Sequence, residues 1–113
     1  MAVVAADMLL GVRRPVVGRD AHGSRVVTSL GPVEGPEPGR VVSEPRADNR
    51  SETGPGVWVL ALDPGFWPVA EGVQVVEVGG AGRTWTISAA EFRPSAFDAG
   101  ISYIRAEAAL NVS

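Results

Sequence analysis

One stretch of the chain, residues 57–87, most constrains the fold. It contains three short runs, VWVLAL, VQVVEV and RTWTI, that are separated by DPGFWPVAEG and GGAG. The runs are rich in β-branched and aromatic side chains, which favour the pleated backbone, whereas Gly, Pro and Asp interrupt it. The stretch therefore predicts three strands joined by two turns, and we expect the rest of the chain to complete this sheet.

The N-terminal part of the chain predicts a hairpin. Residues 9–17 and 25–30 are β-rich and flank the turn sequence GRDAHGS. Pro15 has no N–H to donate to a ladder, so we expect its strand at an edge or with a bulge. The 113 residues fit one domain, and the absence of cysteine excludes a disulfide framework. We therefore predict an all-β fold: a single small β-barrel domain over residues 1–113.

Residues 31–56 differ from the rest of the chain. The segment GPVEGPEPGRVVSEPRADNRSETGPG is rich in Pro and Gly and has few large apolar side chains. Such a composition buries too little surface to offset the entropy of ordering. We predict a long, mostly irregular loop, in which RVVSE at residues 40–44 can add one brief strand. Its tip carries charges of both signs, which fits either a solvated loop or one that a partner orders.

The three-strand stretch carries finer signals. In VWVLAL both alternating faces are apolar, which predicts a strand buried on both sides. Phe66 and Trp67 lie in the Pro-bounded turn that follows, where aromatic rings either cap a barrel end or serve as exposed contacts. The apolar alternation changes face within residues 72–78, which predicts a bulge near Val75 and Val76.

The C-terminal third fits two templates. Ser88 followed by Glu91 resembles a capping box, although Pro94 permits at most one helical turn. In ISYIRAEAALNVS, helical and strand spacings compete. We predict a strand that begins near Ile101 and frays after Ala108.

No catalytic residue, cofactor or metal ligand is expected, and the chain does not read as an enzyme. His22 is the only histidine. Asp20 and Ser24 share its tight turn, where side chains splay apart instead of converging as nucleophile and base. The glycine-rich residues 79–84 lack the lysine and the spacing of a phosphate-binding loop.

The formal charge is −3, and all ten basic residues are arginine. DNA binding without sequence preference needs Lys or Arg to displace counterions from phosphate, so we do not expect it here. The sequence contains no run of about 18 apolar residues of the kind that spans a membrane, and no basic residue precedes the N-terminal apolar run as in a signal peptide. We expect a soluble chain.

Three segments follow one another along the chain: VRRPVVGRDAHGS with its Arg-Arg pair, the polar VVSEPRADNRSETGPG, and VWVLALDPGFWPVAEGVQVVEVGGAGRTWTI. This arrangement resembles the head-to-tail stopper, or head-closure, proteins of siphophages over residues 9–105. Members of that family are single small β-barrels in which a polar loop precedes a strand, a Pro/Gly turn, a V-x-V strand, a glycine turn and a short aromatic strand. The chain departs from the family pattern at two places. Residues 31–39 form a longer segment than is usual in the family, and Phe66-Trp67 lie where an aliphatic or polar turn is typical.

The resemblance implies a structural protein of the phage neck, located in the virion and, during assembly, in the host cytoplasm. It implies a homo-oligomeric ring that closes the DNA-filled capsid and docks the tail. Its partners would be the portal or adaptor protein on the head side and the tail terminator or tail tube protein on the tail side, and DNA would pass through the lumen without specific binding. On this reading the interface or channel loop includes Arg46, Asp48, Asn49 and Arg50, and the docking anchors are Phe66 and Trp67.

Two alternatives stay open. A tail terminator or another neck protein would use a similar small barrel, because a fold does not determine a function. A generic β-barrel interaction module would bind a peptide along an exposed strand edge.

Overall fold

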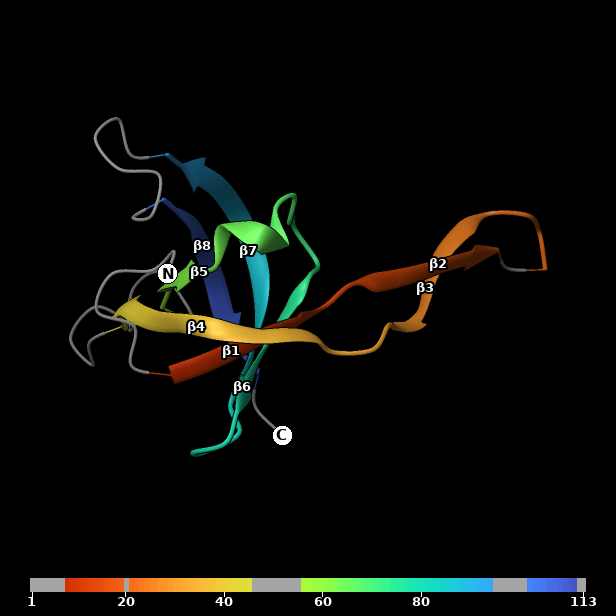
Figure 1. The fold of residues 1–113 in the computed structure, drawn as a ribbon. Coiled ribbons are helices and arrows are strands. Elements are labelled where there is room, and N and C mark those ends of the chain that lie inside the picture. The colour runs from red at the N-terminus through yellow and green to blue at the C-terminus, as the bar shows by residue number, and fades with distance from the viewer. Residues whose placement is uncertain (1–7, 20, 46–55, 95–101, 112–113) are drawn as a thin grey trace.

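The computed structural model describes residues 8–19, 21–45, 56–94 and 102–111, and its centre is a closed barrel of six antiparallel strands (Figure 1). The strands are Met8–Arg13 (β1), Glu34–Ser43 (β4), Trp58–Leu62 (β5), Gln74–Val78 (β6), Thr84–Arg93 (β7) and Tyr103–Leu110 (β8). Around the barrel they follow the order β1, β4, β5, β8, β7, β6, and β6 pairs again with β1. The predicted all-β fold with a small β-barrel is confirmed.

Alternating side chains fill the barrel interior. In β7, Trp85 and Ile87 are buried while Thr86 is exposed, as expected for a strand with one face toward the core. The prediction that β5 is buried on both sides is confirmed only for its second half: Ala61 on the outer face is buried, whereas Val59 is half-buried and Val57, just before the strand, is exposed. The largest fully buried side chains are Leu10, Val12, Leu60, Leu62, Val75, Trp85, Ile87 and Ile104. The interior is therefore a packed core without a channel.

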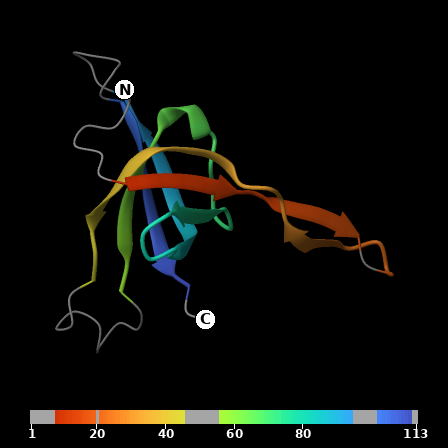
Figure 2. The same cartoon turned by 60° about the horizontal axis from the view of Figure 1, so that its bottom comes forward.

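The predicted N-terminal hairpin forms, but it stands outside the barrel. Pro15–Arg19 (β2) and Arg25–Leu30 (β3) pair in a separate two-stranded antiparallel sheet. Figure 2 shows this hairpin extending the ribbon of β1 and β4 away from the barrel. We call residues 15–30 the arm. The strand of Pro15 is an edge strand, as one of the two predicted alternatives has it, because in the described part of the chain its sheet contains only β2 and β3. The register also shifts between Val16 and Val17, where the extra residue lies on β3.

The prediction that residues 31–56 are mostly irregular is wrong over Glu34–Ser43, which form the ten-residue strand β4. The first half of β4 pairs with β1 and the second half with β5, so Pro36 and Pro38 lie where only one ladder needs N–H donors. Gly35 has a φ of +92°, and a Cβ there would lie 2.8 Å from the ring of Phe66. The glycines and prolines of this segment thus serve a packed strand. Residues 46–55 lie outside the described part.

Two local predictions are corrected. Strand β6 pairs with β1 without interruption from Gln74 to Val78, so the bulge expected near Val75 and Val76 is absent. The alternation stays regular because Glu77, a polar residue, occupies an inward position.

The residues of the supposed capping box belong to β7, whose own bulge lies between Ile87 and Ala89. The C-terminal strand is confirmed as β8, which continues to Leu110, while Ile101 lies outside the described residues.

Trp85→Ala is expected to lower the free energy of unfolding by about 3–5 kcal/mol, because the whole side chain lies in the core. Urea unfolding followed by circular dichroism measures the change. The matched control is Trp67→Ala at an exposed position, for which we expect less than about 1 kcal/mol. Equal effects of the two substitutions would contradict this placement of Trp85.

Candidate interaction surfaces at the two ends of the barrel

The end at which β5 finishes is closed by a short turn of 3-10 helix, Pro64–Phe66 (η2). The Asp63 carboxylate caps this turn by accepting a hydrogen bond of 2.8 Å from the backbone N–H of Gly65. Phe66 is only 6% exposed and belongs to the core, whereas Trp67 is 42% exposed. The expectation that Phe66 is a docking anchor is therefore wrong. Phe66 caps the barrel, and Trp67 alone of the pair faces solvent.

Trp67 lies edge-on against Phe92 of β7, with ring centroids 5.9 Å apart and an interplanar angle of 63°. Phe92 is itself exposed. The two rings form a surface that we call the aromatic rim. Aromatic side chains give large contact areas with few rotatable bonds, which is why they are frequent energetic centres of interfaces.

Arg14 holds this end of the barrel together. Its guanidinium donates to the carbonyl oxygens of Phe66 (2.8 Å) and Pro68 (2.6 Å), on either side of Trp67. It also pairs with the Glu34 carboxylate at 2.8 Å. The side chain thereby links the start of the arm to the turn that carries the aromatic rim. The sequence offered no sign of this role, because the carbonyl acceptors lie more than fifty residues away and any residue type supplies them.

The opposite end of the barrel is closed by a partly buried ion pair. Arg83 follows the glycine turn of residues 79–82, and its guanidinium donates to Oε1 of Glu77 at 2.9 Å and to Oε2 at 3.3 Å. The Arg83 backbone N–H donates to the same carboxylate at 3.1 Å. Glu77 is buried, while the Arg83 side chain is 32% exposed.

Two tryptophans flank this ion pair. The Arg83 guanidinium carbon lies 5.2 Å from the ring centroid of Trp85 and 5.7 Å from that of Trp58, within cation–π range. The two rings meet edge to face at 5.6 Å. Nε1 of Trp85 is buried without a hydrogen-bond partner among the described residues, which leaves one donor of this cluster unsatisfied.

The hydrogen bonds from Arg83 lower the pKa of the Glu77 carboxyl below its ordinary value, although burial of the carboxyl opposes this shift. The pKa of Arg83 rises for the same reason. Both groups are therefore charged at neutral pH. The cluster is a structural closure of the barrel, because its charges satisfy each other and leave none for a ligand.

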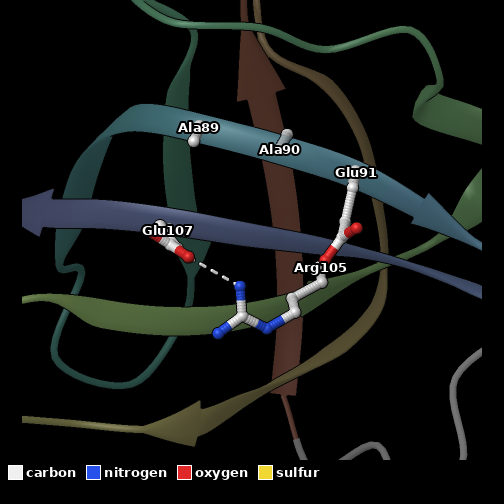
Figure 3. A pocket seen from close by; sticks show the side chains of 5 residues that line it. All are labelled: Ala89, Ala90, Glu91, Arg105 and Glu107. Carbon is white, nitrogen blue, oxygen red and sulfur yellow. Dashed lines mark hydrogen bonds and ion pairs between the residues drawn. The ribbon is translucent and has the colours of Figure 1, made fainter.

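A shallow hollow of about 230 Å³ lies on the outer face of β7 and β8 (Figure 3). It is lined by Ala89 and Ala90 and by three charged residues, Glu91, Arg105 and Glu107. Arg105 pairs with Glu107 at 2.7 Å, and Glu91 pairs with Arg93 at 2.7 Å. The hollow is smaller than typical ligand pockets, and its charges are already neutralised by neighbours. It does not define a ligand site.

The remaining predicted site residues, Arg46, Asp48, Asn49 and Arg50, lie outside the described residues. The ends of their segment do lie in the described part: Pro45 and Gly56 approach each other closely, at the barrel end where β5 begins. Among the described residues, no group of three or more His, Asp or Glu is placed to hold a metal ion. The same residues contain no helix long and apolar enough to cross a membrane.

Comparison with family models, with curated proteins and with solved structures finds no match to this chain.

Glu77→Gln is expected to destabilise the fold at neutral pH by about 1–3 kcal/mol, because Arg83 loses its charged partner. The folded-state pKa of Glu77 is depressed below 4.5, so the wild-type advantage is present above that value and is lost as the pH falls through the folded pKa. Urea unfolding over a pH series measures it. The matched control is Glu107→Gln, whose carboxylate is 40% exposed in its pair with Arg105, against 9% for Glu77; for this control we expect under about 1 kcal/mol. If the free energies of unfolding of wild type and Glu77→Gln differed by the same amount at every pH, the result would contradict this role of Glu77.

Proposed function

We propose that the chain is a structural protein of the siphophage neck, a head-to-tail stopper that closes the DNA-filled capsid and docks the tail. The observation that carries the proposal is a small closed barrel whose interior is filled with side chains and whose two ends are closed. Such a body offers surfaces for assembly rather than a pocket for chemistry. It also agrees with the single small barrel that the sequence resemblance implies.

The positions of the two appendages support an adaptor role. The arm leaves the barrel at the Phe66 end, where Arg14 binds the η2 turn. The segment that joins β4 to β5 starts and finishes at the other end, near Trp58. A ring subunit in a neck contacts neighbours above, below and beside it. Appendages rooted at opposite ends of a rigid body suit that requirement.

DNA passage in this proposal uses the centre of a ring of copies, because the barrel of a single copy is solid. Identical subunits in such a ring meet through heterologous contacts that close by rotation. The net charge of −3 favours a lumen along which DNA slides without binding. Within this ring we assign the interface or channel-loop role to Arg46, Asp48, Asn49 and Arg50.

Trp67 is the docking residue that we propose at the aromatic rim, facing either the portal–adaptor side or the tail terminator and tail tube side. The peptide-binding alternative is less well supported at the barrel, because its six strands pair in a closed ring and strand addition needs an open edge; such edges remain on the two short strands of the arm. A tail terminator or another neck protein remains the main competitor, since the same barrel suits each of these roles.

Imaging of virions and of particles from a phage with this gene disabled tests the proposal. We expect the chain in a ring between head and tail, and its loss should give filled heads that leak DNA and unjoined tails of normal length. Overlong tails beside intact filled heads would contradict the stopper role and favour a tail terminator. Virions without the chain would overturn a structural role altogether.

Trp67→Ala is expected to leave the barrel folded and to weaken tail joining by roughly 30-fold, the loss typical of an aromatic residue at the centre of an interface. Complementation of the disabled phage, scored as joined particles by electron microscopy, measures this effect. Val57→Ala serves as the control because Val57 is also exposed but lies at the other end of β5. Normal joining by the Trp67 variant would remove the aromatic rim from the docking surface.

Deletion of residues 47–52 is expected to leave a folded chain and to abolish tail joining, because the deleted residues form the tip of the proposed channel loop. Circular dichroism checks the fold, and the same complementation assay measures joining. Normal infectivity of the deletion variant would contradict the channel-loop role without affecting the role of Trp67.

A further inference from the structure

The arm is firmly rooted but lies away from the barrel (Figures 1 and 2). At its base the Arg13 guanidinium donates to the carbonyl oxygens of Gly31 (2.7 Å) and Leu30 (3.2 Å). The Gly31 backbone N–H donates to the carbonyl oxygen of Arg14 at 2.8 Å. These bonds tie both strands of the arm to the barrel, so the arm has a defined direction.

The arm is a two-stranded sheet, and a two-stranded hairpin is at best marginally stable in water unless one face packs against something. Val17 on β2 is 47% exposed, and Val16 is exposed to a similar extent. Neighbouring residues of a strand face opposite sides, so each face of the ribbon exposes one of these valines. A packing partner that covers one face would bury aliphatic surface, which contributes to stability. The arm therefore has the properties of a contact element.

A surface of matching chemistry lies on the outside of the barrel. Leu9 of β1 is 45% exposed and is flanked in register by Pro38 of β4 and Val78 of β6, the latter 41% exposed. Val33, also exposed, lies against Gly11 of β1. We call Leu9, Val33, Pro38 and Val78 the outer stripe. It crosses three neighbouring strands, β4, β1 and β6.

One chain cannot join its own arm to its own outer stripe. The arm continues β1 after the single residue Arg14, so it points away along the strand direction while the stripe lies on the side of the same strand. A contact between them needs a second copy. Net charge favours contact between the arm of one copy and the body of another, because two arginines and one aspartate give the arm a formal charge of +1, which leaves −4 on the rest of a chain whose total is −3.

We propose that the arm of one copy packs across the outer stripe of the next copy. The contact is heterologous, because the arm and the stripe are different surfaces, and repetition of one such contact yields a ring where the rotation closes. The step from this contact to a closed ring in the phage neck rests on the proposed function. The contact between two copies can be tested on the purified chain alone.

Two single variants make the test specific. Val17→Asp places a carboxylate on the arm, and Leu9→Asp places one on the outer stripe, both at exposed positions. Sedimentation velocity over a concentration series is expected to show self-association of wild type, weakened about tenfold or more in each variant. An equimolar mixture of the two variants keeps one intact arm and one intact stripe, so it should form a one-to-one dimer that cannot grow.

Val42→Asp is the matched control, because Val42 is an exposed valine on the same barrel outside both surfaces. It should associate as wild type does. Circular dichroism checks that every variant is folded, and Val17→Ser and Leu9→Ser replace the Asp variants if one is not. The two Ser variants should also weaken self-association.

Cross-linking identifies the surfaces directly, since the chain contains no cysteine. With a mild oxidant, Val17→Cys/Val78→Cys should give a ladder of disulfide-linked oligomers. Val17→Cys alone should give none. Linked dimers from Val17→Cys alone would instead indicate arm-to-arm contact and overturn the proposal, as would a monomeric wild type or a variant mixture without dimer.

The outcomes separate this inference from the proposed function. Association through arm and stripe in a chain that virions lack would leave the inference intact and reject the neck role. A ring in the neck that still forms with Val17→Asp and with Leu9→Asp would leave the neck role intact and reject the contact between arm and stripe.

Discussion

The pairing of β1 with β6 is the contact on which the rest of the structure depends. Five consecutive residue pairs, from Leu9 with Val78 to Arg13 with Gln74, join the first strand to one that begins some sixty residues later in the chain. Val12 and Val75 face each other in this ladder, and both are completely buried. The pairing converts an open sheet into a barrel. It thereby removes the sheet edges at which foreign strands add and leaves the ends, the outer faces and the arm as the available surfaces.

The two ends of the barrel are closed by different means. At one end Phe66 supplies an apolar cap, and Arg14 holds the backbone of that cap through carbonyl groups. At the other end a charged pair, Glu77 and Arg83, lies between tryptophan rings. The charged closure weakens once the Glu77 carboxyl takes up a proton.

The sequence predicted the parts of this fold that local chemistry decides. Alternation around Trp85, the glycine turn after β6 and the arm hairpin all follow from short-range patterns, and each is present. Strand β4 was missed because its glycines and prolines read as disorder, whereas Gly35 in fact makes room for Phe66, a partner that no local pattern reveals. Of the two proposed anchors, adjacent in sequence and equally aromatic, only the tertiary contacts distinguish buried Phe66 from exposed Trp67.

The ion pair was within reach of sequence reasoning. Glu77 occupies an inward position of a regular strand, and Arg83 is the first residue after a tight turn, so a hairpin brings the two side chains together. The sequence prediction instead took the polar Glu77 as a change of face in the apolar alternation, so it expected a bulge and missed the ion pair. The role of Arg14 could not be predicted in this way. Its partners are backbone carbonyl groups far along the chain, and every residue type supplies such a group.

Arg14 also gives the two proposed contact elements a common support. It is the single residue between β1 and β2, and its guanidinium binds the carbonyl groups on both sides of Trp67. Arg14 therefore connects the base of the arm directly to the backbone of the turn that carries the aromatic rim. In a ring, where an arm held by a neighbour fixes its direction, the same side chain would fix the position of the docking surface. Lateral assembly and axial docking would then share one support.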